Sequence, residues 1–325
     1  MKRLAKILGL LAAVLVIAAV GVYAWASLTT GRLRAQTFVT HTVDFPIPFP
    51  LDPTEVSAMG LTEDTARQLA QTRAVERGQH LVTARYTCVA CHGANFGGGV
   101  MVDAFPLGSL LAPNLTLGRG GRTAAYTPRD WDRIVRHGVL TDGHPAVMPS
   151  EDFQRMSDQE LSDIVAYIRT LPAVDNTVPT STFGPLGKVL VATGQMKFSA
   201  TQIAHHDATH LTHPPDAGSA EFGKHLASVC MGCHGPDFSG GPIVGGDPSW
   251  PQARNLTPDA TGLKGWTYDQ FVTALARSQR PDGTALRPPM TLMAPYGQRM
   301  TDSERQSLWS YFQSIPAVSK TIPAR

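Results

Sequence analysis

The sequence Cys88-Val89-Ala90-Cys91-His92 occurs a second time, with the same spacing, as Cys230-Met231-Gly232-Cys233-His234. These two segments contain all four cysteines of the 325-residue chain. Two thiols three positions apart, followed at once by an imidazole, are typical of covalent haem attachment. Each thiol adds to one vinyl group of the porphyrin, and the adjoining histidine is thereby held beneath the iron as an axial ligand. The sequence therefore predicts two haem c groups, bound through Cys88, Cys91 and His92 and through Cys230, Cys233 and His234.

Two other uses of a C-x-x-C pair fit this chain less well. A thioredoxin-like redox site belongs in a strand-rich βαβ context, whereas helical patterns surround both motifs here. A zinc site could pool the two pairs, but each pair is followed by its own histidine and sits in its own repeat. Haem attachment also consumes every cysteine, so that no free thiol is left in an oxidising compartment.

The likeness between the two halves extends beyond the cysteines. Residues 76–81 resemble residues 221–226, and Asn-Leu-Thr occurs at 114–116 and again at 255–257. The last apolar stripe of each half ends at Leu171-Pro172 or Ile315-Pro316, as expected of a terminal helix. Capping-box signals precede the predicted helices at Thr127/Asp130, Ser157/Glu160, Thr267/Gln270 and Thr301/Glu304. We therefore predict an internal duplication of a small all-helical unit.

The N-terminus has the composition of a membrane anchor. Lys2, Arg3 and Lys6 precede an uncharged stretch over 7–30, which is longer than the about 20 apolar residues that cross a bilayer. We expect a single-pass helix in the cell inner membrane, with a cytoplasmic N-terminus and periplasmic haem domains. A cleaved signal peptide is the alternative, because 24–26 reads Ala-Trp-Ala, although a signal core is usually only about 7–15 residues long.

The segments expected along the chain follow from these patterns. They are an anchor over 1–34, an extended Pro-rich spacer and helix start over 35–69, a first haem domain over 70–175, a linker over 176–217 and a second haem domain over 218–325. The 28 basic and 26 acidic residues nearly balance and form no basic block, so we expect no nucleic-acid partner.

The sixth ligand of each iron decides its chemistry. A neutral thioether stabilises ferrous iron and raises the potential. Met148 follows an Asp-Gly turn between two predicted helices and is the candidate in the first half. In the second half we expect Met290, which follows a Pro-Pro turn, with Met293 as the alternative.

These residues together resemble the membrane-anchored di-haem c-type cytochromes. Those proteins are tandem class I cytochrome c domains, similar to the cytochrome subunits of bacterial periplasmic alcohol and aldehyde dehydrogenases. The resemblance implies an all-α fold of two such domains after one transmembrane helix, with His92 and His234 as proximal ligands and Met148 and Met290 as distal ligands. It also implies that the Pro113 carbonyl accepts a hydrogen bond from His92. Arg254 replaces that proline in the second half.

The function expected on these grounds is electron transfer through two His/Met-ligated haems, with no catalysis by this chain. A quinol-oxidising complex or a dehydrogenase would donate electrons, and an oxidase or a soluble cytochrome would accept them. One alternative is a di-haem peroxidase-like enzyme, which needs an open sixth position on an iron. Another is a dedicated electron-transfer subunit of a periplasmic dehydrogenase complex. Such subunits usually carry three haems, whereas this chain has two motifs.

Three weaker features have simple interpretations. Asn114 and Asn255 match N-glycosylation sequons but fall at equivalent points of the repeat, which favours a structural role beside the haem. Trp131 and Trp266 are expected in the cores or at the haem edges. Four linker histidines show no helical ligand spacing and are expected to be solvated loop residues rather than metal ligands: His205, His206, His210 and His213.

Overall fold

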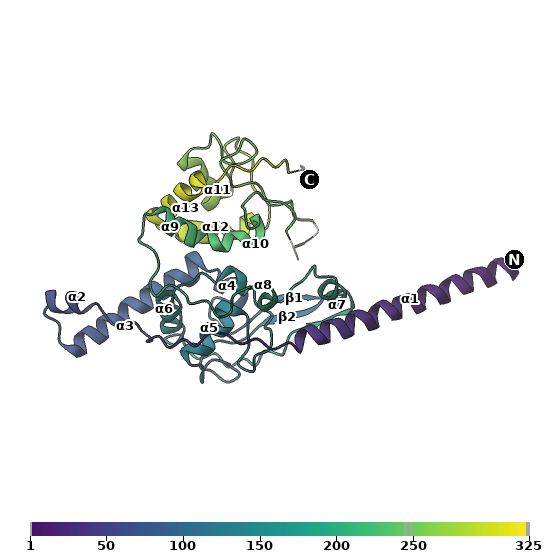
Figure 1. Ribbon diagram of the computed structural model, residues 1–325, viewed down its shortest axis with the longest axis horizontal. Helices are drawn as coiled ribbons and strands as arrows, with labels where there is room; N and C mark the ends of the chain where they lie inside the picture. The colour runs from purple at the N-terminus through teal and green to yellow at the C-terminus, as the bar shows by residue number, and fades with distance from the viewer. Residues whose placement is uncertain (1, 244–245, 248, 323–325) are drawn as a thin grey trace.

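The computed structural model describes residues 2–243, 246–247 and 249–322. A long helix, α1 (Lys2–Arg34), projects from a two-lobed body in which the first lobe carries α2 to α8 and the second carries α9 to α13 (Figure 1). The first-lobe elements are α2 (Pro53–Ala58), α3 (Glu63–His80), η1 (Leu81–Arg85), α4 (Cys88–His92), β1 (Gly99–Ala104), β2 (Gly108–Ala112), α5 (Pro128–His137), η2 (Ser150–Asp152), α6 (Asp158–Ile168), β3 (Thr182–Phe183), α7 (Pro185–Ala192) and α8 (Ser199–Gln202). The second-lobe elements are α9 (Ala220–Leu226), η3 (Ala227–Cys230), α10 (Met231–His234), α11 (Tyr268–Arg277), α12 (Met290–Arg299) and α13 (Asp302–Ser314).

Each lobe is organised around one crossing of two helices, α3 with α6 and α9 with α13. A glycine stands at each crossing because the backbones touch there. A Cβ added at Gly78 would lie 2.0 Å from the Asp163 carbonyl oxygen, and one at Gly223 would lie 2.0 Å from the Ser307 carbonyl oxygen. The two crossings are built alike at equivalent positions, as the predicted duplication requires.

The four predicted capping boxes are all present. In each box the side chain of the cap residue accepts a hydrogen bond from the backbone N–H three residues further on. The side chain of that third residue accepts a hydrogen bond from the backbone N–H of the cap residue. The four cap residues are Thr127, Ser157, Thr267 and Thr301. These reciprocal bonds satisfy N–H groups that a helix start leaves without intrahelical partners. The sequence signal therefore located these four helix starts correctly.

A small antiparallel sheet departs from the all-helical expectation. Strands β1 and β2 form a hairpin with a bulge between Val100 and Val102, and β3 adds to the other edge of β2. The sheet belongs to the first lobe alone among the described residues, and it lies beside the haem motif. A Cβ at Gly99 would meet the Cys91 carbonyl oxygen at 2.2 Å. The cores themselves are helical, as predicted.

The apolar helix α1 is long and apolar enough to cross a membrane, and its most apolar window has a mean hydropathy of 2.7 with none of it buried in the protein. Its last turns dock on α7, which belongs to the linker sequence and packs with the first lobe. Thr30 is buried there and donates from Oγ1 to the Lys188 carbonyl oxygen at 3.2 Å. The Lys188 ammonium lies 3.1 Å from the Tyr23 hydroxyl. The linker therefore carries two short helices and contacts the anchor as well as the lobes.

Candidate haem sites and the interface between them

The first candidate site is a cavity of about 230 Å³ beside the first C-x-x-C-H segment. Cys88, Cys91 and His92 line one wall, and Met148 lines the same cavity. The remaining lining is mostly apolar, with aromatic, aliphatic and proline side chains from α5, α6, β2 and the loop before η2. The pocket is therefore apolar and is bordered by a thiol pair, an imidazole and a thioether. Such a pocket suits a large, flat, hydrophobic cofactor with a metal centre.

The cavity also contains a polar atom that lacks a partner. The indole Nε1 of Trp131 is buried without a hydrogen-bond acceptor, and Trp131 and Arg122 both line the cavity. Buried donors are normally paired, so an orphaned indole N–H points to a missing acceptor. Haem carries propionate carboxylates, and Trp131 and Arg122 are suitable donors for one. The residues present therefore fit haem on a ground independent of the cysteine motif.

The chemistry of the thiols agrees with attachment rather than with redox exchange. Burial, and then the neighbouring Cys91, raises the pKa of the Cys88 thiol to about 12. Burial, and then Cys233, likewise raises the pKa of Cys230 to about 12. Reactive disulfide-exchange cysteines have lowered pKa values instead. The two pairs also do not converge on a shared zinc site within the described part of the chain, where the one metal-competent side-chain group contains no cysteine.

Each predicted proximal histidine is held by one ring nitrogen. The Nδ1 of His92 lies 3.0 Å from the Pro113 carbonyl oxygen, and the Nδ1 of His234 lies 2.7 Å from the Arg254 carbonyl oxygen. Each Nδ1–H donates to that carbonyl, so Nε2 keeps its lone pair for a metal. Burial lowers the pKa of both imidazoles, which favours the neutral ligand form. The acceptor is a backbone group, and for this reason Arg254 serves as well as Pro113.

The predicted distal methionines occupy different settings. Met148 is half-buried against the first core and faces the cavity that contains His92. Met290 begins α12, and Met293 lies one turn further along the same helix, with both side chains half-buried. Helix α12 packs on α11 and against η1 of the first lobe. The choice of Met290 over Met293 stays a prediction.

The two sequon asparagines are structural. Asn114 and Asn255 are 0% and 2% exposed, which leaves no room for a glycan. In each repeat the side-chain Nδ2 donates to the carbonyl oxygen that follows the last helix, Val174 or Val318, at 2.7 Å. The same amide accepts a hydrogen bond from the backbone of the Thr two residues on, at 2.9 Å. These asparagines fasten the loop beyond each haem motif to the end of its domain.

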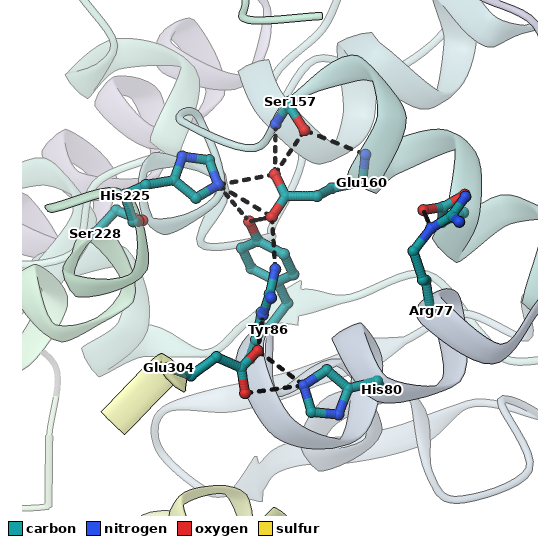
Figure 2. A network of polar contacts seen from close by, with 10 residues as sticks. Arg77, His80, Tyr86, Ser157, Glu160, His225, Ser228 and Glu304 are labelled. Carbon is teal, nitrogen blue, oxygen red and sulfur yellow. Dashed lines mark hydrogen bonds and ion pairs between the residues drawn. The ribbon is translucent and has the colours of Figure 1, made fainter. Parts of the chain in front are cut away.

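The two lobes share one interface, which is built around two reciprocal histidine–glutamate contacts. His80 of the first repeat binds Glu304 of the second at 2.8 Å, and His225 of the second binds Glu160 of the first at 2.8 Å (Figure 2). The two histidines occupy equivalent positions of the duplicated sequence. The two glutamates are also equivalent, since each closes the capping box of its domain's last helix. The interface is therefore pseudo-twofold.

Tyr86 lies in the middle of this interface beside Glu160 (Figure 2), and Arg85 is its neighbour in the chain. Arg85 bonds both glutamates, through Nη1 to Glu160 at 3.1 Å and through Nε to Glu304. The Tyr86 hydroxyl donates to Glu160 at 3.1 Å and lies 3.3 Å from Nε2 of His225. Burial by itself would raise the pKa of Glu304, but the His80 hydrogen bond and the Arg85 charge outweigh it and lower the pKa to about 2. Both glutamates are therefore ionised and paired at neutral pH.

The two haem-attachment segments meet at this same interface. A Cβ added at Gly232, inside the second motif, would lie 2.9 Å from either carboxylate oxygen of Asp152 in the first lobe. Tyr296 on α12 of the second lobe lies close to the first motif, because burial and then the Cys88 and Cys91 thiols raise the pKa of its hydroxyl. In Figure 1, α4 and α10 lie on the facing sides of the two lobes. Cofactors attached through these segments are thus held at adjoining edges of the domains.

The residues of this interface were not predicted from the sequence. The available signal was the recurrence of a histidine at positions 80 and 225 and of a capping glutamate at positions 160 and 304. Repeated polar residues are conspicuous only when both copies are inspected together. The expectation of solvated linker histidines is wrong for two of the four residues. His206 and His210 are not solvated loop residues but pack against buried His137 of α5.

Comparison with known proteins agrees with this geometry. Residues 73–168 match the family model for cytochrome c oxidase, cbb3-type, subunit III, and residues 220–316 match the model for cytochrome c. The chain is 25% identical over 264 residues to the fructose dehydrogenase cytochrome subunit of Gluconobacter japonicus, covering 76% of this chain and 54% of that protein. It is 28% identical over 281 residues to the cytochrome c subunit of the quinone alcohol dehydrogenase of Gluconacetobacter polyoxogenes, covering 77% and 57%.

A shorter match links the chain to the gluconate 2-dehydrogenase cytochrome c subunit of Pantoea cypripedii, with 35% identity over 100 residues, which cover 29% of this chain and 22% of that protein. The chain spans about half the length of the first two relatives. The two matched regions coincide with the two duplicated helical units, and each contains one C-x-x-C-H segment. The chain therefore contains two tandem cytochrome c domains, and each of them has the attachment site of one covalent haem c.

Proposed function

We propose that this chain passes electrons between two haem c groups at the outer face of the cytoplasmic membrane and performs no substrate chemistry of its own. Bound haem supplies one-electron Fe(III)/Fe(II) chemistry. The protein residues supply the axial ligands, exclude water and fix the position of each cofactor. We propose Cys88, Cys91, Cys230 and Cys233 as attachment residues, and His92 with Met148 and His234 with Met290 as axial pairs, with Met293 as the alternative to Met290.

The observation that carries this proposal is the shared interface. Asp152 of the first lobe lies against the second attachment segment and Tyr296 of the second lobe lies close to the first, so both segments border the same interface. The pairs His80–Glu304 and His225–Glu160 lock the relative position of the lobes on both sides. A fixed juxtaposition of two redox sites is what intramolecular electron transfer requires, whereas an enzyme site requires an open ligand position and access for a substrate.

We further propose that α1 remains attached and spans the inner membrane with its N-terminus in the cytoplasm. Lys2, Arg3 and Lys6 precede the apolar stretch, as the positive-inside rule requires. The contacts of Thr30 and Lys188 support a retained anchor, because they give the last turns of α1 a specific docking site. The first lobe would then be the one closer to the bilayer.

For the partner we propose a periplasmic dehydrogenase or a quinol-oxidising complex as donor, and an oxidase or soluble cytochrome as acceptor. The first two relatives are named as cytochrome subunits of fructose and alcohol dehydrogenases, which favours a dehydrogenase partner over the other donor. In this form the chain would be a dedicated electron-transfer subunit of such a complex.

Carbon monoxide binding tests the proposal directly. The full-length, haem-loaded protein in detergent is reduced anaerobically and mixed with carbon monoxide at neutral pH. His/Met ligation at both irons predicts no rapid change in the reduced spectrum. Rapid stoichiometric binding at either haem would reveal an open position, would count against a pure carrier and would favour the peroxidase-like alternative. Co-purification of a flavin, quinone or molybdenum subunit would identify the dehydrogenase-subunit form.

A further inference from the structure

A second cluster of ligand-type side chains lies in the first lobe and involves none of the haem-site residues. It consists of His41, Asp132, His137 and His210, and we refer to it as the histidine cluster. One nitrogen or oxygen atom from each of the four side chains lies within 4.8 Å of the others. Asp132 and His137 are 0% exposed, and the side chain of His210 is 8% exposed. Three separate parts of the chain meet here: the spacer after α1, helix α5, and the linker between the domains.

The separations within the histidine cluster are those of a metal coordination sphere. The Nε2 atoms of His137 and His210 are 3.2 Å apart. The carboxylate of Asp132 places Oδ2 3.6 Å from Nε2 of His137 and Oδ1 3.7 Å from Nε2 of His210. In a tetrahedral zinc site with bonds of about 2.0–2.1 Å, neighbouring ligand atoms are about 3.3 Å apart. Small side-chain movements would bring these atoms onto one ion.

The hydrogen bonds around the cluster indicate which ring nitrogens carry no proton and are available to a metal ion. His206 Nε2 lies 2.9 Å from the Ala200 carbonyl oxygen and must donate to it, so the other ring nitrogen of neutral His206 is an acceptor. His137 Nδ1 lies 3.1 Å from that acceptor and donates to it, which leaves His137 Nε2 without a proton. His41 Nδ1 donates to the His206 carbonyl oxygen at 3.3 Å, so its Nε2 is also available.

Such partners on the far nitrogen are the usual means of orienting metal-binding histidines. His206 therefore acts on two members of the cluster, through its ring on His137 and through its carbonyl on His41. Burial, and then the neighbouring histidines, lowers the pKa of His137 to about 2. Burial, and then the charge of Arg136, lowers the pKa of His210 to about 3. Both imidazoles are therefore neutral at pH 7, which is the form that binds a metal.

The carboxylate of Asp132 provides an independent sign of a ligand. Arg136 donates a hydrogen bond to Oδ1 from Nε at 2.8 Å, and its Nη2 lies at ion-pair distance, 2.7 Å, from the same oxygen. Neither Nη2 of Arg136 nor Oδ2 of Asp132 has a hydrogen-bond partner, and both atoms are buried. An unpaired buried carboxylate oxygen is costly. Arg136 also pairs with Asp158 at 2.7 Å, so its positive charge is shared between two carboxylates. A cation bound at the cluster would give Oδ2 the partner that it lacks.

We propose that the histidine cluster binds one divalent d-block cation, zinc in particular, through one atom from each of His41, Asp132, His137 and His210. Four protein ligands leave no open position, so the role is structural. The ion would fasten the spacer after the membrane anchor and the interdomain linker to α5. This would hold the first haem domain at a fixed distance from the bilayer. None of the four residues belongs to either haem site.

The test uses the full-length, haem-loaded protein, exposed to Zn²⁺, dialysed against metal-free buffer and analysed for zinc by mass spectrometry. The proposal predicts one zinc per two haems in the wild type. It predicts loss of most of that zinc in His41→Gln and His210→Gln, and full retention in the matched control His205→Gln, an exposed residue of the same linker. His206→Ala should weaken zinc affinity about 10–100-fold, because it removes the acceptor that orients His137.

X-ray absorption at the zinc edge makes the test independent of variant folding. Four nitrogen or oxygen ligands at about 2.0 Å, with no sulfur, are expected for the wild type. Removal of zinc with a chelator should lower the melting temperature of the wild type and leave that of His210→Gln unchanged. No bound zinc in the wild type, zinc retained in both ligand variants, or a sulfur ligand would each overturn the proposal. If the wild type binds no zinc, the cluster is a hydrogen-bonded histidine network without a metal.

Discussion

Replacement of Glu304 by glutamine tests whether the reciprocal ion pairs fix the two domains together. The Glu304 carboxylate is 1% exposed and binds His80 at 2.8 Å as well as Arg85. Glutamine has nearly the same shape but no charge. It also preserves the capping box, because Gln270 already fills the equivalent position of the Thr267 box in this protein. The variant therefore removes the charge while the helix start is kept.

The expected loss of stability follows from the pKa of the Glu304 carboxyl. Its pKa of about 2, against an ordinary value of 4.5, corresponds to about 3 kcal/mol of stability at pH 7. Because the folded-state pKa is the lower one, this stability is complete above pH 4.5 and is lost as the pH falls towards 2. At pH 3 the advantage of the wild type over the variant should be only about 1 kcal/mol.

Urea unfolding of the haem-loaded protein, followed by circular dichroism, measures the effect. With a denaturant slope of about 2 kcal/mol/M, the variant midpoint should fall by about 1.5 M at pH 7 and by roughly a third of that at pH 3. Glu221→Gln is the matched control, since Glu221 is exposed on the same domain and should change stability by less than about 0.5 kcal/mol. Equal midpoints for Glu304→Gln and the wild type at pH 7, or a difference that does not change with pH, would refute the reasoning.

Three further predictions concern single residues. Gly223→Ala should destabilise the second domain by several kcal/mol, because the added Cβ meets the Ser307 carbonyl oxygen at 2.0 Å; a melting curve close to that of the wild type would contradict the close helix crossing. Trp131→Phe should lower stability by about 1–2 kcal/mol and shift the potential of one haem only, as measured by a redox titration, because it removes one indole donor from the first cavity. An unchanged potential and stability would mean that Nε1 has no partner in the loaded protein. Met148→Ala should abolish the sulfur-to-iron charge-transfer absorbance of one haem and leave that of the other; loss at both, or at neither, would contradict the ligand assignment.

The features that the sequence predicted correctly are those encoded within a short stretch of chain. A capping box needs residues only three positions apart, and all four predicted boxes are present. The C-x-x-C-H motif carries both its attachment residues and its axial histidine. The duplication supplied further local information, since Asn114 and Asn255 stood out by occupying equivalent positions. The structure gives both asparagines the same two hydrogen-bond partners.

The features that escaped prediction depend on contacts between distant segments. His41, His137 and His210 meet only after the spacer and the linker fold back on α5, and no periodicity relates them. The pair between His80 and Glu304 joins residues of different domains, so neither helix pattern predicts it by itself, and the only signal is the recurrence of both residues in the two repeats. The third strand of the sheet was missed because it comes from the linker, far along the chain from the hairpin that it joins.

Intact-protein mass spectrometry under denaturing conditions tests the central claim most directly, because only covalently attached haem survives unfolding. The account predicts the mass of the polypeptide plus two haem groups. It also predicts one haem fewer when both Cys88 and Cys91 are replaced by alanine, and likewise for Cys230 and Cys233. A wild-type mass equal to that of the bare polypeptide, or of the polypeptide with one haem, would contradict the account.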